Sequence, residues 1–141
     1  MSAFVLDASI AIAWCFEDEA DPAVDALLDS LKAQGAVVPA LWPLEVTNVL
    51  LQAERRGRIT MVTVDGRRAA FEALPITVDT TSWLRTGAAI LGLARLHGLT
   101  IYDAAYLELA TRQRLPLATR DKALGRAAAA AGDADLPDPK S

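Results

Sequence analysis

Short apolar runs alternate with helix-period segments along this chain of 141 residues. A few consecutive apolar residues followed by a longer amphipathic segment are typical of a buried strand and its crossover helix. We therefore expect strands at residues 3–6, 36–38, 76–78 and 117–119, with helical segments between and after them. This alternation predicts a three-layer α/β/α fold with a central parallel sheet and about seven helices.

Composition narrows the class of protein. The chain is 52% hydrophobic and 23% charged, which is typical of a folded domain. We assign this domain to residues 1–131 and expect the turn-rich residues 132–141 to fray. The single cysteine, Cys15, and the single histidine, His97, exclude a disulfide framework and a zinc site of four cysteine or histidine ligands. The net charge is −4, so the whole chain has no long-range attraction for nucleic acid.

No segment predicts a membrane association. The longest stretch without a charged residue, residues 33–44, is only 12 residues long and contains glycine and proline, so it is too short and too broken to span a bilayer. The N-terminal residues MSAFVLD lack the basic region of a secretory signal. We expect a cytoplasmic protein.

Acidic residues occur where the predicted strands end. Asp7 directly follows the first strand, Asp121 follows the fourth, and Asp103 opens the helix between them. In parallel α/β sheets, ligands bind beyond the carboxyl ends of the strands. Glu45 and Asn48 lie along the border of the apolar stripe of a predicted helix. This position places the Glu45 carboxylate at the rim of the sheet.

Two interpretations of these acids stay open. Four unpaired carboxylates in one cleft would repel one another and raise each other's pKa. A bound Mg²⁺ or Mn²⁺ would remove this repulsion and allow phosphodiester hydrolysis. Alternatively, each Asp caps a helix, and Thr100 with Asp103 fits a capping box. For any one Asp alone we favour the cap. Glu45 does not fit this explanation, because a carboxylate bordering an apolar face needs a partner.

Four segments together resemble the PIN-domain ribonucleases, specifically the VapC-type toxins of bacterial type II toxin–antitoxin pairs. They are VLDAS at 5–9, LWPLEVTNVL at 41–50, GLTIYDAAYLELA at 98–110 and LATRDKAL at 117–124. The resemblance implies strand order 3-2-1-4 and a metal-dependent endoribonuclease. It implies that Mg²⁺ or Mn²⁺ is held by the acidic quartet Asp7, Glu45, Asp103 and Asp121.

The resemblance also implies supporting residues and partners. Ser9 and Thr119 match pocket-lining positions, where we expect hydroxyl donors behind the acids, and Asn48 matches a polar position after the motif's Glu. An RNA substrate, a cognate antitoxin and a homodimer are implied as partners. The fifth strand with which the family often ends is doubtful here, because the last helix continues into the turn-rich tail.

One basic region departs from the acidic balance of the chain. It contains five arginines against a single acid, and the arginines are Arg55, Arg56, Arg58, Arg67 and Arg68. They are candidate contacts to an RNA backbone, or an ordinary solvated face.

Alternatives from other classes fit less well. A phosphatase of the haloacid dehalogenase type needs a second Asp two residues after Asp7, where Ser9 stands, and a receiver domain needs an adjacent acidic pair. A PIN-like module that binds RNA or protein without cutting is the remaining alternative. Cys15, Trp14, Trp42 and Trp83 fall on apolar positions and are expected in the core.

Overall fold

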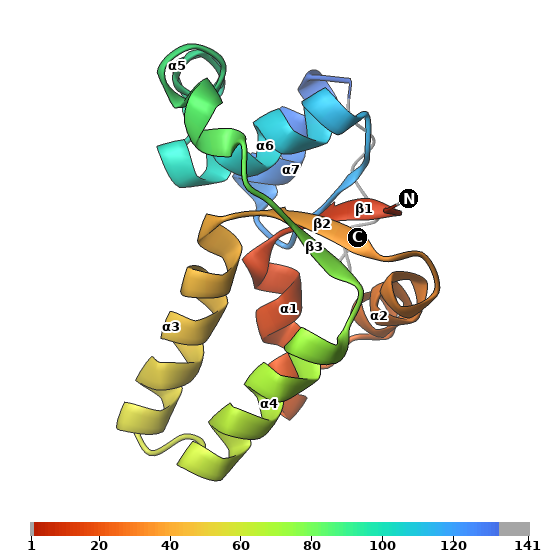
Figure 1. Cartoon of the computed structure of the whole chain (residues 1–141), viewed down its shortest axis with the longest axis vertical. Helices are drawn as coiled ribbons and strands as arrows, with labels where there is room; N and C mark the ends of the chain where they lie inside the picture. Colours follow the sequence, from red (N-terminus) through yellow and green to blue (C-terminus); the bar gives the residue numbers. More distant parts are fainter. Residues whose placement is uncertain (1, 133–141) are drawn as a thin grey trace.

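A computed structural model describes residues 2–132 of the chain, so the predicted tail from residue 133 onward lies outside the described residues. Strands and helices alternate as the apolar pattern predicts (Figure 1). The strands are β1 (Phe4–Leu6), β2 (Ala36–Pro39), β3 (Ile76–Asp79) and β4 (Leu117–Ala118). The α-helices are α1 (Ala8–Cys15), α2 (Pro22–Gln34), α3 (Leu41–Arg55), α4 (Met61–Ala73), α5 (Leu91–His97), α6 (Ile101–Gln113) and α7 (Lys122–Ala130).

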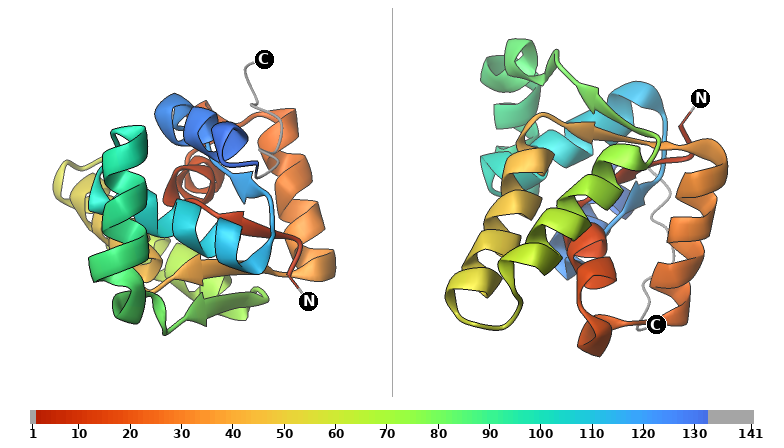
Figure 2. Two further views of the ribbon diagram at one scale, coloured as in Figure 1. Left: turned by 90° about the horizontal axis from the view of Figure 1, so that it is seen from above. Right: turned by 60° about the horizontal axis from the view of Figure 1, so that its bottom comes forward.

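The four strands form one parallel sheet in the order β3-β2-β1-β4. The predicted fold class and strand order are confirmed, with four strands and seven α-helices in residues 2–132. Helices α5 and α6 cover one face of the sheet, and α1, α3 and α4 lie on the other (Figures 1 and 2). The order reverses between β1 and β4, which places the ends of these two strands side by side.

The core lies on both faces of β1. Phe4, Val5 and Leu6 are all buried, and α6 is buried at seven consecutive positions from Ala104 to Ala110. A helix that is buried all round must lie between two layers, and α6 lies between the sheet and the helices α5 and α7. Cys15 and Trp42 are in the core as predicted, and Trp14 packs against it with its indole N–H donating to the Val24 carbonyl at 2.8 Å.

The segment before α5 differs from the prediction. Instead of one regular α-helix, the chain forms a 3₁₀ turn (Ser82–Arg85), a π-helical turn (Thr86–Ile90) and then α5. A 3₁₀ or π turn does not have the 3.6 residues of an α-helical turn. Trp83 therefore lies on a different side of the segment from Ile90 and Ala94, which are buried. Trp83 is 73% exposed, so its predicted core position is wrong.

None of the helices in residues 2–132 combines the length and apolarity that crossing a membrane requires.

Gly35 joins α2 to the sheet at a point where only glycine fits. Its φ of 79° and ψ of 172° lie in a region that other residues rarely adopt. A Cβ on Gly35 would lie 2.9 Å from the Pro75 carbonyl oxygen, which accepts a hydrogen bond from the Ala36 amide at 3.1 Å. The starts of β2 and β3 are therefore held together beside this glycine.

We expect Gly35→Ala to lower the free energy of unfolding by roughly 2 to 3 kcal/mol, through backbone strain and the clash with Pro75. Gly57→Ala is the matched control: Gly57 also has a positive φ, of 74°, but nothing lies within 4 Å of its added Cβ. Strain alone should cost about 1 kcal/mol there. Urea unfolding measures both, and equal losses would contradict the proposed clash.

Candidate active site

Asp7 lies at the carboxyl end of β1 and is only 6% exposed. Its Oδ2 accepts hydrogen bonds from the hydroxyls of Ser9 at 2.6 Å and Thr119 at 2.7 Å. Asp7 stands at the N-cap position of α1, yet its side chain forms no cap hydrogen bond. Helix capping therefore does not explain this carboxylate.

The same two hydroxyls connect Asp7 to the loop that follows β4. The Ser9 hydroxyl accepts the Arg120 amide at 2.9 Å, and the Thr119 hydroxyl accepts the Asp121 amide at 3.0 Å. Asp121 is exposed, and its Oδ1 accepts the Leu124 amide at 3.0 Å as the N-cap of α7. Asp121 therefore caps α7, and the cap leaves the residue beside the Asp7 network.

Helix α6 brings the other two predicted acids toward Asp7. Asp103 lies in its first turn, where the Asp103 amide donates to the Thr100 hydroxyl at 3.1 Å, as the capping box predicts. One turn later, the hydroxyl of Tyr106 donates to Glu45 Oε1 of α3 at 2.8 Å. The sequence analysis missed Tyr106. Tyr106 follows Asp103 by three residues and therefore lies on the same helix face, and this spacing could have identified it as a site residue.

Three of the four carboxyl groups have raised pKa values. Burial is the main cause for Asp7, and the hydrogen bonds from Ser9 and Thr119 only partly oppose it. Burial also raises the pKa of Glu45, and the charges of Asp7 and Asp103 raise it further, against the hydrogen bond from Tyr106. For Asp103, burial and then the charges of Asp121 and Asp7 raise the pKa. The four carboxylates therefore share one electrostatic neighbourhood.

Another acid, Asp79, whose side chain is 8% exposed, shows what a cation would change. Arg112 donates to Asp79 Oδ2 at 2.9 Å and to Glu108 Oε1 at 2.9 Å. Burial tends to raise the pKa of Asp79, but the bonds and charge from Arg112 and its neighbours lower it to about 2. In the described residues, none of the four site acids forms an ion pair with Lys, Arg or His.

The donor set fits a hard divalent cation. Carboxylate oxygens are the ligands that Mg²⁺ and Mn²⁺ prefer. A cation would offset the burial that is the main cause of these raised pKa values, and also the repulsion that adds to those of Glu45 and Asp103. However, no three His, Cys, Asp or Glu side chains of residues 2–132 already lie where they could hold a metal ion together. An ion at this site would have to draw the carboxylates closer to one another.

The remaining predicted site residues are Asn48, one turn after Glu45 on α3, and the five arginines. Asn48 is exposed and lines a small pocket with Arg56 and Arg58. The guanidinium of Arg58 pairs with Asp18 at 2.7 Å and lies 3.9 Å from the centre of the Phe16 ring. Arg68 pairs with Glu72. The other predicted RNA contacts, Arg55, Arg56 and Arg67, are exposed.

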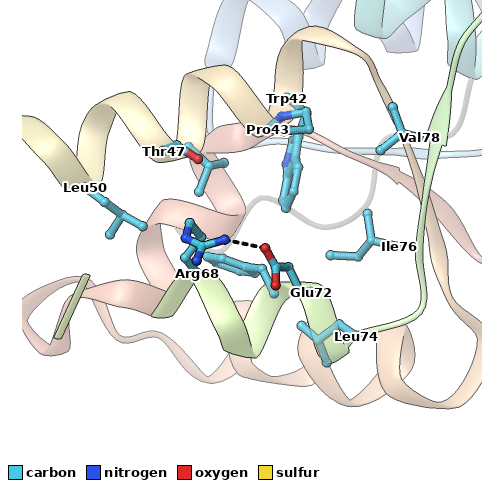
Figure 3. Close-up of a pocket in the computed structure, with 11 residues that line it drawn as sticks. Trp42, Pro43, Thr47, Leu50, Arg68, Glu72, Leu74, Ile76 and Val78 are labelled. Atoms are coloured by element: carbon cyan, nitrogen blue, oxygen red, sulfur yellow. Dashed lines mark hydrogen bonds and ion pairs between the residues drawn. The ribbon is translucent and has the colours of Figure 1, made fainter. Parts of the chain in front are cut away.

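An apolar pocket of about 290 Å³ lies between α3, α4 and β3 (Figure 3). The Trp42 ring extends from α3 into the group of lining residues, and Arg68 and Glu72, one turn apart on α4, point toward each other beside it (Figure 3). The edge of Trp42 contacts Phe71, with the ring centres 5.6 Å apart. None of the four acids lines this pocket, so it does not belong to the candidate site.

Comparisons with known proteins agree with this geometry. The sequence profile of the PIN domain matches residues 4–130. Ribonuclease VapC3 of Mycobacterium tuberculosis, from strains CDC 1551 / Oshkosh and ATCC 25618 / H37Rv, is 35% identical over 89 residues. This match covers 63% of the present chain and 62% of the relative.

The raised pKa of Glu45 predicts how an amide would change stability. The folded pKa lies above the ordinary value of 4.5, so the folded protein binds the proton more tightly than the unfolded chain does. Stability is therefore lost as the pH rises above about 4.5, and the loss is complete above the folded pKa. Glu45→Gln should raise the melting temperature in EDTA at pH 7, and the gain should vanish below pH 4.5.

Thermal unfolding followed by circular dichroism across this pH range measures the effect. Glu17→Gln, at an exposed position, is the control and should change the free energy of unfolding by less than about 0.5 kcal/mol. A Glu45→Gln variant that is less stable at every pH would contradict the electrostatic account.

Proposed function

Because the chain belongs to the PIN domain family, we propose that it is a metal-dependent endoribonuclease. It hydrolyses RNA phosphodiester bonds in the cytoplasm as the toxin of a toxin–antitoxin pair. One observation carries this proposal: Asp7, Glu45 and Asp103 have raised pKa values at the carboxyl edge of the sheet. The similarity to a protein named Ribonuclease VapC3 supports the same class of reaction.

Asp7, Glu45, Asp103 and Asp121 are the proposed ligands of Mg²⁺ or Mn²⁺. A divalent ion supplies positive charge for the scissile phosphate and lowers the pKa of water to a value useful near neutral pH. The side chains of this chain orient the carboxylates that hold it. The hydroxyls of Ser9 and Thr119 fix Asp7, and the hydroxyl of Tyr106 fixes Glu45. Such supporting hydrogen bonds position ligands before a reaction begins.

The second candidate is a PIN-like module that binds RNA or protein without cutting. It is favoured by the absence, in residues 2–132, of three acidic, His or Cys side chains already placed around one metal position. The two candidates differ in their response to a divalent ion, because only the nuclease needs one for its activity.

The proposed partners are an RNA substrate, a cognate antitoxin and a second copy of the chain in a homodimer. Arg55, Arg56 and Arg67 are exposed and stay candidate contacts to the RNA backbone. Arg58 and Arg68 belong to the same proposed set, and each would have to exchange its intramolecular ion pair for a phosphate.

Asp7→Asn should lower RNA cleavage in Mg²⁺ or Mn²⁺ by about 100-fold or more, because even residues behind metal ligands cost 10- to 100-fold. The fold should persist, since an amide oxygen can accept the hydrogen bonds from Ser9 and Thr119. Single-turnover cleavage of labelled RNA, with metal and then with EDTA, measures this. Asp29→Asn, at an exposed position of α2, is the matched control; cleavage by Asp7→Asn at the wild-type rate would refute the assignment.

Metal binding should also stabilise the native protein. At a Mn²⁺ concentration ten times the dissociation constant, the gain is about 1.4 kcal/mol, or roughly 4 °C in melting temperature for a domain of this size. The shift should disappear in Asp7→Asn. A wild-type melting temperature that is the same in millimolar Mn²⁺ and in EDTA would count against a metal site.

A further inference from the structure

An RNA strand cannot approach the acidic quartet without help from cations. Each phosphate of RNA is an anion, and one divalent ion neutralises only part of four carboxylates. The net charge of −4 adds no attraction over longer distances. Binding of a polyanion here therefore requires positive side chains close to the acids.

Five arginines in residues 2–132 are already paired with acids. Arg112 binds Asp79 and Glu108, and Arg85 approaches Glu108 at 3.5 Å. Arg120 lies 3.6 Å from Glu19. As described above, Arg58 and Arg68 also have acidic partners. A cation held by a carboxylate must give up that partner before it can bind a phosphate.

Lys122 and Arg126 are among the exposed cations that have no acidic partner in residues 2–132, and they are the two of that group that line a pocket together with Asp121. They stand four residues apart on α7, so they are neighbours on one helix face. Two like charges at this spacing destabilise a helix slightly. An anion bound between them would reverse the sign of that interaction.

These two side chains line a pocket of about 350 Å³ that also contains Asp121 and Thr119. Gly125 and Ala129 line it too, and such small residues let a ligand come close to the helix. The Thr119 hydroxyl donates to Asp7 and accepts the Asp121 amide. The pocket is therefore continuous with the carboxylate network.

We propose that this pocket is a phosphate-binding subsite, in which Lys122 and Arg126 hold the RNA backbone next to the bond that is cut. The proposal rests on the proposed function. Lys122 and Arg126 are positioning residues, because they bind a neighbouring phosphate and not the reacting one. The subsite is built on α7 at the β4 edge of the sheet, whereas the arginines at 55–68 belong to α3, α4 and the connection between them (Figures 1 and 2). The two regions approach each other at Glu19, which lies 3.8 Å from Arg58 and 3.6 Å from Arg120, a further residue of the pocket.

The test is RNA binding by the double variant Lys122→Gln/Arg126→Gln. Fluorescence anisotropy with a labelled single-stranded RNA of randomised sequence is measured in EDTA, where no metal-dependent cleavage occurs, over a range of NaCl concentrations. Loss of two phosphate contacts should weaken binding about tenfold at low salt and reduce the slope of log K against log[salt] by about 1.4.

Two further variants separate position from total charge. Lys32→Gln/Arg95→Gln removes the same charge from exposed positions on α2 and α5, and it should keep the wild-type salt slope. Lys122→Arg/Arg126→Lys keeps both charges in the pocket and should also keep that slope. A wild-type slope in Lys122→Gln/Arg126→Gln, or an equal loss in Lys32→Gln/Arg95→Gln, would overturn the subsite.

Cleavage in Mn²⁺ distinguishes this proposal from the proposed function. A wild type that cuts RNA, together with a Lys122→Gln/Arg126→Gln variant of unchanged KM and salt slope, removes the subsite and leaves the nuclease. A wild type that binds RNA through this pocket but never cuts removes the nuclease and leaves the subsite. A wild type that binds no RNA overturns both.

Discussion

A carboxylate buried at the end of the central strand, with no cation beside it, is the constraint on which the site depends. Asp7 extends β1 by one residue, between the ends of β2 and β4, and is 6% exposed. Ser9 and Thr119 satisfy its hydrogen bonds, but hydroxyls do not neutralise a charge. Hydrogen bonding therefore explains the orientation of Asp7 and does not offset the full cost of burying its charge.

The chain does not lack cations for buried acids. Arg112 binds Asp79 at the end of β3 and Glu108 on α6, and so fastens the edge strand to the central helix. The resulting pKa of Asp79, about 2, is that of a structural ion pair. Asp7, Glu45 and Asp103 have the opposite environment within the same fold. This separation of paired and unpaired carboxylates marks the second group as the candidate functional site and supports the proposed cation there.

The sequence predicted the strands and the acids that follow them, because short apolar runs between amphipathic helices have few other arrangements. Strand order came from the family resemblance, since pairing between β1 and β4 spans more than 110 residues. The bond from Tyr106 to Glu45 was missed, because no local pattern shows which helices face each other. Trp83 was misplaced where 3₁₀ and π turns replaced the expected helix. Whether the carboxylates close around an ion depends on side-chain geometry that no spacing encodes.

The two proposals together have a thermodynamic consequence. Without a metal ion, the carboxylates repel the phosphates that Lys122 and Arg126 attract. This repulsion weakens the binding of RNA. A bound divalent ion removes part of that repulsion, and RNA must then bind more tightly. By linkage, RNA must strengthen metal binding by the same factor. The two proposals thus couple substrate and metal through charge, because Asp121 belongs to both the carboxylate network and the pocket beside α7.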